Sequence, residues 1–283
     1  MSNNSTDSPG KHKYKDRKSK FVDAYIITIL NDFYSTASAR ECIKSIKHTT
    51  TWANPILFNA TTPDTIVSDI KLYLHEWQDG LLDSWGNPRY TWPVVPQQDG
   101  IDFSTGLYKR HYKAKDVRKV IAAAISHMRL WAACYYNDRP FIILEHDARF
   151  IRHMKSSYFL DQRDDKAPQL PHSGMWFNGV CSLNDPRGAT RRAVYYHEQM
   201  VKMSGCRPVI PVNQPGEPPL PEGLPGNSAY IIAPEAAKQL LDKAAQIGIW
   251  PNDALMCRQL FPFIQSYYPY FTKVDQRKST TTQ

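Results

Sequence analysis

Two carboxylates, Glu145 and Asp147, stand one residue apart directly after the apolar run FIILE (141–145). Carboxylate oxygens are ligands that suit Mg²⁺ or Mn²⁺, and such a cation neutralises a diphosphate leaving group. The alternative is a surface turn with solvated acids, because the pattern E-x-D is common. We take Glu145 and Asp147 as candidate metal ligands, with Mn²⁺ or Mg²⁺ as the expected cofactor.

Two further residues have side chains that exchange protons. His127 lies within a predicted helix, where a single histidine is ordinarily a packed or capping group. Asp253 follows Trp250-Pro251-Asn252 in a turn. There an aspartate either caps the next helix or serves as a general base or acceptor-binding carboxylate. We take His127 and Asp253 as catalytic candidates.

The elements that must position these residues alternate between strand and helix. FVDAYIITIL (21–30) and FIILE are continuous apolar runs, typical of buried parallel strands, and PILFNA (55–60) resembles another. Helical spacing covers 115–136 and a segment opened by Pro234. This order predicts an α/β fold with an open, mostly parallel sheet and helices on both faces. Chemistry in such sheets gathers beyond the carboxyl ends of the strands, where Glu145 and Asp147 stand.

The charge of the chain is concentrated at its ends. The net charge is +8 over 283 residues, of which residues 1–20 carry +4 and residues 273–283 carry +2. We predict a disordered basic arm over 1–20 and a basic tail over 273–283. Between them, 21–272 is predicted to form a single domain with long loops at 78–108 and 160–226.

Several protein classes are excluded by what the sequence lacks. No apolar run approaches the roughly 18 residues that span a bilayer, and the polar N-terminus has no secretory h-region. The five cysteines form no C-x-x-C pair, which indicates reduced thiols rather than a disulfide frame or a zinc site. We expect a cytoplasmic, monomeric protein with no integral membrane association.

Four motifs follow one another in a fixed order along the chain. They are A-x-x-S-H-x-x-x-W, I-L-E-x-D-A-x-F, A-Y-I-I-x-x-x-A-A-K-x-L-L and P-x-D, at 123–131, 143–150, 229–241 and 251–253. Their order and spacing resemble glycosyltransferase family 25, which includes lipooligosaccharide galactosyltransferases and procollagen galactosyltransferases. The resemblance covers about residues 21 to 260, with gaps across 48–110 and 160–225.

The resemblance implies a GT-A fold, a UDP-sugar donor, a divalent cation and inversion at the anomeric carbon. The E-D-D motif of the family falls on Glu145, His146 and Asp147, so a histidine replaces the middle acid. The late P-x-D motif makes Asp253 the candidate base, whereas the H-P-P ending of the family is missing from SYYPYF (266–271). The residues assigned to donor binding are Thr28, Asn31, Ser126 and Glu145.

Clusters of lysine and arginine favour an acceptor that is rich in phosphate groups. The chain is also similar to compact phage enzymes that glycosylate hydroxymethylated cytosines in DNA, so we predict double-stranded DNA as partner and, for a phage-encoded enzyme, the host cytoplasm as location. The residues assigned to DNA phosphates are Lys109, Arg110, Lys113, Lys115, Arg191 and Arg192. One alternative is a lipooligosaccharide or cell-surface glycan glycosyltransferase whose basic arm docks on anionic lipid. Another is a non-catalytic nucleic-acid-binding protein on a degenerate transferase scaffold.

Overall fold

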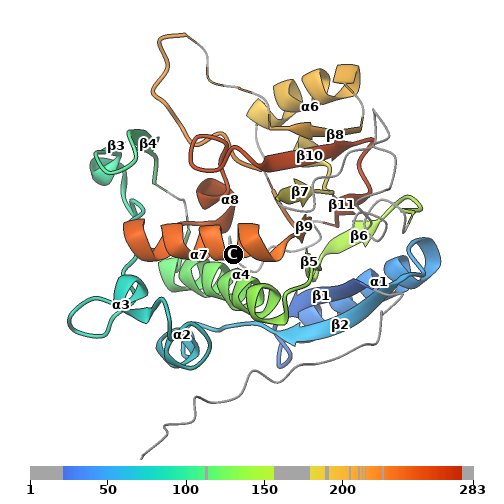
Figure 1. Cartoon of the computed structure of the whole chain (residues 1–283), viewed down its shortest axis with the longest axis horizontal. Helices are drawn as coiled ribbons and strands as arrows, with labels where there is room; N and C mark the ends of the chain where they lie inside the picture. Colours follow the sequence, from blue (N-terminus) through green and yellow to red (C-terminus); the bar gives the residue numbers. More distant parts are fainter. Residues whose placement is uncertain are drawn as a thin grey trace, which may run out of the picture.

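The computed structural model describes residues 22–275, apart from 112–113, 156–178, 189–190 and the single positions 204, 210, 212, 214 and 225. Figure 1 shows the whole chain. The principal elements are β1 (Val22–Thr28), α1 (Phe33–Thr49), β2 (Ala53–Asn59), α2 (Ile66–Tyr73), α3 (Gln78–Leu81), β3 (Gly100–Asp102), β4 (Leu107–Lys109), α4 (Val117–Asn137), β5 (Phe141–Glu145), β6 (Ala148–Phe150), β7 (Val180–Ser182), α6 (Arg191–Met203), β8 (Gly205–Pro208), β9 (Ala229–Ile232), α7 (Pro234–Ile247), α8 (Asn252–Leu255), β10 (Ile264–Tyr268) and β11 (Thr272–Val274).

A seven-stranded sheet forms the centre, in the order β2-β1-β5-β9-β7-β10-β8. β1 pairs in parallel with both β2 and β5, and β7 pairs in parallel with β10. β9 runs antiparallel to both β5 and β7, and β8 runs antiparallel to β10 at the edge. The expected open, mostly parallel α/β sheet is therefore confirmed.

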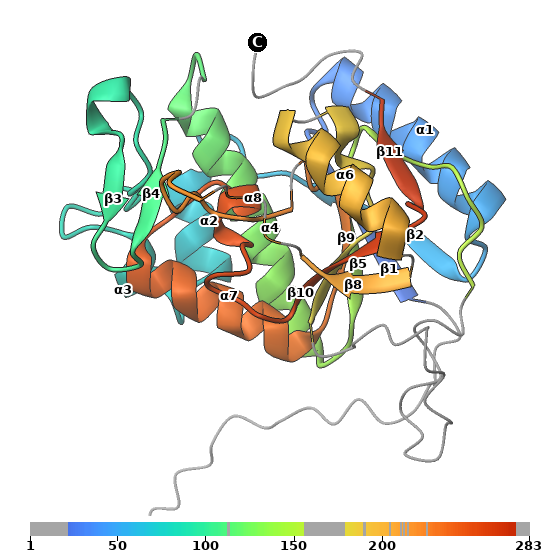
Figure 2. The same ribbon diagram turned by 90° about the horizontal axis from the view of Figure 1, so that it is seen from above.

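Helices cover both faces of the sheet (Figure 2). Successive residues of β1 point to opposite faces, because side chains alternate along a strand. Ile26 packs in the cluster that includes Ala39 and Cys42 of α1. Ile27 packs in the cluster on the other face, built by α4 and α7 with fully buried Trp131 and Leu240. The strands read as continuous apolar runs because both faces are buried.

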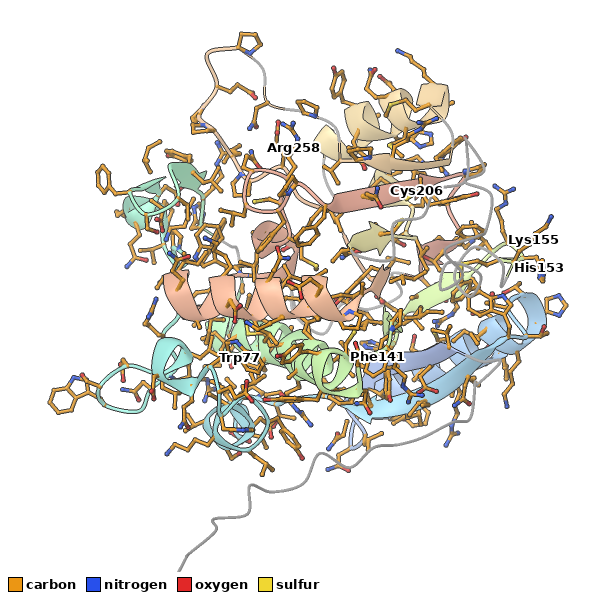
Figure 3. The ribbon with its side chains drawn as sticks, in the orientation of Figure 1. Trp77, Phe141, His153, Lys155, Cys206 and Arg258 are labelled. Carbon is orange, nitrogen blue, oxygen red and sulfur yellow. The ribbon has the colours of Figure 1, made fainter. Side chains whose placement is uncertain are left out.

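Side-chain hydrogen bonds fix the ends and positions of the helices around the sheet. The Asp32 carboxylate caps α1 by accepting a hydrogen bond of 2.6 Å from the Ser35 amide, and Asp116 caps α4 in the same way. The indole of Trp77, labelled in Figure 3, donates to Asp242 of α7 at 2.8 Å. These contacts hold the α2–α3 segment against the face that α4 and α7 share.

The predicted loop over 78–108 is only partly a loop. It contains α3 and the β3–β4 hairpin, whose strands pair from Gly100–Lys109 to Asp102–Leu107. Within the hairpin turn, the Asp102 carboxylate accepts from Ser104 and Thr105, and Gly106 adopts a φ of +71°. Elements of three or four residues are too short to produce a periodic pattern, which is why the sequence did not reveal them.

The predicted loop over 160–226 is wrong for much of its described part. β7 and β8 are strands of the central sheet, and α6 packs over β8 and β10 (Figures 1 and 2). Pro208 is tolerated because β8 lies at the sheet edge, where one side of the strand needs no ladder bond. Proline density therefore misled the sequence prediction. Residues 160–178 lie outside the described residues.

The predicted tail begins too early. Thr272, Lys273 and Val274 form β11, which pairs antiparallel with β6. The Asp275 amide then donates to the Asp147 carbonyl at 2.9 Å, so the end of the described chain supports the segment that carries a candidate metal ligand. The arm over 1–20 and residues 276–283 lie outside the described residues.

A search of the described residues for membrane-spanning helices finds none that combines the necessary length with the necessary apolarity.

Candidate active site

The candidate site lies at the carboxyl edge of β5. Glu145 is the last residue of β5 and is paired with Ile27, next to the end of β1. Because β9 is antiparallel, its first residues reach the same edge, and the Glu145 amide donates to the Ser228 carbonyl at 2.8 Å. The sheet thus brings the end of β5 and the start of β9 together.

His127 is held at this edge by a buried chain of hydrogen bonds. The Trp131 indole N–H donates to the Tyr230 hydroxyl at 2.8 Å, and that hydroxyl lies 2.7 Å from His127 Nδ1. An indole nitrogen only donates, so the hydroxyl oxygen accepts from Trp131, and in the Nε2–H tautomer of His127 the hydroxyl donates its own proton to Nδ1. His127 Nε2 then carries a proton toward Glu145 Oε1, 3.5 Å away. The His127 side chain is 2% exposed and the Glu145 side chain is 40% exposed. The buried histidine therefore positions a carboxylate that lies at the surface of the site.

Asp147 is a buried acid with an unmet hydrogen-bonding atom. Burial and, next, the nearby Glu145 carboxylate raise the pKa of Asp147 to about 7, although Arg149 opposes this rise. Its Oδ1 atom is buried and has no hydrogen-bond partner within the described residues. A buried acceptor without a partner is unfavourable by about 1–3 kcal/mol. Burying the Asp147 carboxylate in this way therefore destabilises the fold, so its presence indicates a role other than stability.

Asp253 enters the same site from another element. It lies in the first turn of α8, and Gly223 packs so closely against its backbone that a Cβ there would clash with the Asp253 carbonyl. Burial raises the pKa of Asp253, the Glu145 carboxylate raises it further, and His127 lowers it. A carboxylate with a raised pKa is a better proton acceptor, as a general base requires.

A divalent cation fits the two carboxylates. Asp147 has an unused buried oxygen, and its repulsion from Glu145 would be relieved by a positive charge between them. The described residues contain no group of three or more His, Cys, Asp or Glu side chains arranged to hold a metal ion. Two carboxylates suit Mg²⁺ or Mn²⁺ that takes its other ligands from water and substrate phosphates. Burial, the larger effect, lowers the pKa of His146, so the residue that replaces the middle acid is a neutral imidazole.

Two of the residues assigned to donor binding, Thr28 and Ser126, use their hydroxyl groups in hydrogen bonds within the fold, whereas Asn31 is exposed. The Thr28 side chain is fully buried and its hydroxyl donates to the Ile26 carbonyl at 2.9 Å. The Ser126 hydroxyl donates to the Ala122 carbonyl and accepts from the Thr61 amide, both at 2.9 Å. These two hydroxyls are used within the fold, which contradicts a donor contact through them. Asn31 is exposed in the turn after β1, where it is open to a ligand.

The basic residues assigned to DNA differ in their exposure where the structure describes them. Lys109 Nζ pairs with Asp102 Oδ2 at 2.6 Å, donates to the Thr91 carbonyl and lies 5.2 Å from the centre of the Trp250 ring. Its side chain is only 12% exposed, so the prediction that Lys109 binds phosphate is contradicted. Arg110 and Lys115 are exposed. Lys113 lies outside the described residues. Arg191 and Arg192 are in the first turn of α6, and their side chains lie outside the described part.

Four residues of the site escaped the sequence prediction. Trp131 and Tyr230 belong to the quoted motifs but were not assigned to the site. The signal for them is an indole on α4 and a hydroxyl on β9, which form a hydrogen bond with each other. Asn227 and Ser228, each 3% exposed, precede β9. Two polar residues immediately before a wholly apolar strand could have drawn attention to them.

Comparison with known proteins assigns the chain to a family. Residues 97–256, more than half of the chain, match the family described as glycosyltransferase family 25 (LPS biosynthesis protein). No curated protein matches the chain. A solved structure, the apo form of mouse xyloside xylosyltransferase 1, is similar with a TM-score of 0.35 and 9% identity, over 86% of this chain and 80% of that chain. Glu145, Asp147 and Asp253 all fall within the matched residues, and the chain belongs to glycosyltransferase family 25.

Proposed function

We propose that this glycosyltransferase moves a sugar from a UDP-sugar to a hydroxyl acceptor, with Mn²⁺ or Mg²⁺ held by Glu145 and Asp147. The observation that carries the proposal is the unpartnered, buried Oδ1 of Asp147 beside Glu145 at the carboxyl end of β5. Acids that repel one another at such an edge are typical of a site that a charged ligand completes.

Each residue has a distinct part in the reaction. Asp253 accepts the proton of the acceptor hydroxyl, whose oxygen forms the new bond to the anomeric carbon as the bond from that carbon to the diphosphate breaks. His127 orients Glu145 through its Nε2 proton, and Tyr230 fixes His127. When bound, the cation neutralises the negative charge of the departing UDP. The attack from the face opposite the leaving group inverts the anomeric carbon, as the family resemblance implies.

The acceptor is the less supported part of the proposal. Hydroxymethylcytosine in DNA remains our predicted acceptor, but Lys109 no longer contributes to it, and exposed Arg110 and Lys115 are its described support. The description of the family as LPS biosynthesis proteins favours the alternative, a saccharide acceptor of the lipooligosaccharide class.

The test incubates the protein with a panel of UDP-sugars and Mn²⁺, with hydroxymethylcytosine DNA or a saccharide as acceptor, and measures UDP release and the product mass. We expect UDP release that requires the cation and is lost in Asp147→Asn. A mass gain on DNA nucleosides supports the DNA acceptor, whereas transfer only to the saccharide supports the alternative. No UDP release from any donor, with or without acceptor, would contradict the proposed function.

A further inference from the structure

Two buried polar side chains at the start of β9 lack partners of their own. Asn227 and Ser228 are each 3% exposed. Asn227 Oδ1 and Ser228 Oγ have no hydrogen-bond partner within the residues that the structure describes. The Asn227 amide nitrogen makes one weak contact, 3.9 Å from the Met256 sulfur. Most buried polar side-chain atoms in proteins have a hydrogen-bond partner, so two adjacent exceptions require an explanation.

Their position is between the two halves of the site. The carbonyl of Ser228 accepts the amide of Glu145 at 2.8 Å. Met256, which Asn227 touches, directly follows α8, the helix that carries Asp253. The pair therefore lies next to the end of β5, which carries the carboxylate assigned to the cation, and in contact with the residue that follows α8, which carries the carboxylate assigned to the acceptor proton. In the proposed reaction the transferred sugar lies close to both elements.

The chemistry of the two side chains selects their ligand. An amide oxygen accepts hydrogen bonds and does not donate them, and a serine hydroxyl both donates and accepts. Neither carries a charge, and the carboxylates of Glu145 and Asp253 lie nearby. An ionised phosphate oxygen has no proton to donate to the Asn227 amide oxygen, whereas an O–H group satisfies it. Sugar hydroxyls are ligands that supply such O–H groups and can also accept from Ser228.

We propose that Asn227 and Ser228 bind hydroxyl groups of the transferred sugar and so determine which UDP-sugar is used. This inference rests on the proposed function, because it assigns a subsite within the same transferase centre. It separates recognition of the sugar, by uncharged groups at the start of β9, from recognition of the diphosphate, by the cation at the end of β5.

The test compares the affinities of wild type, Asn227→Ala and Ser228→Ala for UDP and for UDP-glucose, UDP-galactose and a UDP-pentose, with Mn²⁺ present. We expect each variant to lose about three- to tenfold in affinity for the preferred UDP-sugar, the effect of one neutral hydrogen bond, and to keep its affinity for UDP. The ranking of the sugars should also change. The melting temperature should stay equal or rise, because each substitution removes an unsatisfied buried group.

Ser45→Ala is the matched control, since that serine lies in α1 outside the proposed site and both its hydrogen bonds are made, to the Cys42 carbonyl and from the Phe150 amide. It should lower the melting temperature and leave the preference for UDP-sugar over UDP unchanged. Wild-type affinity for every UDP-sugar in both variants, or an equal loss for UDP and UDP-sugar, would overturn the inference. A wild-type protein that binds neither UDP nor UDP-sugar would instead overturn the proposed function, and the inference with it. Asn227→Leu, which keeps the branching at Cγ, replaces Asn227→Ala if that variant does not fold.

Discussion

Asp102 in the β3–β4 hairpin and Asp147 beyond β5 are both largely buried aspartates, yet their surroundings differ. The salt bridge to Lys109 and hydrogen bonds from Lys109 and Ser104 outweigh the effect of burial and lower the pKa of Asp102 to about 2. Burial and Glu145 raise the pKa of Asp147 to about 7. The hairpin pairs its charges internally, whereas the β5 edge leaves a carboxylate uncompensated.

This difference distinguishes polar side chains that pair with one another to hold the fold from polar side chains that are left to bind a ligand. In the hairpin, sequence suggested a basic binding surface, but the structure uses Lys109 to hold the hairpin against Thr91 and Trp250. At the β5 edge the unmet acceptors belong to Asp147, Asn227 and Ser228. Proteins retain such local conflicts mainly where a ligand resolves them. The predictions below test this contrast.

The largest effect is expected at the presumed base. Asp253→Asn keeps the shape of the side chain but removes its ability to accept a proton, so kcat for transfer should fall about 10³-fold, within the range of general base catalysis. Affinity for UDP should persist in a binding titration. Asp79→Asn, on the exposed surface of α3, is the control and should leave kcat unchanged. A normal kcat in Asp253→Asn would assign the base to another residue.

Substitutions in the β3–β4 hairpin should lower the free energy of unfolding and leave transferase activity unchanged. Lys109→Met leaves Asp102 largely buried without its cation, and we expect the free energy of unfolding to fall by about 2–3 kcal/mol in urea denaturation. The double variant Lys109→Met/Asp102→Asn should recover most of this loss. Lys115→Met, at an exposed lysine, is the control. Unchanged stability of Lys109→Met, together with weaker retention on DNA at low salt, would restore the DNA-binding prediction for Lys109.

The hydrogen-bond chain behind Glu145 should show an intermediate effect. Tyr230→Phe leaves the Trp131 indole and His127 Nδ1 without their partner, and we expect a loss of about 1–2 kcal/mol in unfolding free energy. Because His127 is then free to change tautomer, kcat should fall more than the affinity for UDP. Equal kcat in Tyr230→Phe and wild type would limit the chain to a structural role.

The raised pKa of Asp147 also predicts a pH dependence of stability. The Asp147 pKa of about 7 lies above the ordinary value of 3.8, so the folded protein keeps a proton that the unfolded chain has lost between these values. The free energy of unfolding should therefore decrease as pH rises from about 4 to 7, by up to about 4 kcal/mol from this group in EDTA, since each unit of pKa difference corresponds to about 1.4 kcal/mol. Denaturation at several pH values measures the slope, which Asp147→Asn should reduce. An identical slope in that variant would contradict the raised pKa.

The sequence predicted the framework better than the details. The strands β1 and β5 are long apolar runs, and the helices α4 and α7 have clear helical periodicity. The sequence therefore predicted the sheet and the edge where Glu145 lies. β7 and β8 were missed because three- and four-residue strands among prolines carry no such signal.

The site was predicted in part for a similar reason. Glu145, Asp147, His127 and Asp253 have distinctive side chains and a motif order, and the fold brings them together. Whether a polar group is satisfied depends on contacts between distant segments, such as Ser126 with Thr61 or Lys109 with Asp102. The sequence does not reveal those contacts, so it assigned Ser126 and Lys109 to ligands and overlooked Asn227 and Ser228.

The most direct test of the account measures the melting temperature of wild type and Asp147→Asn at pH 8, in EDTA and in Mn²⁺ with UDP. We predict that Asp147→Asn melts at a higher temperature than wild type in EDTA, because the uncompensated charge is gone. We also expect Mn²⁺ with UDP to raise the melting temperature of wild type but not of the variant. A variant that melts below wild type in EDTA and gains as much from Mn²⁺ with UDP would contradict the assignment of Asp147 to a cation.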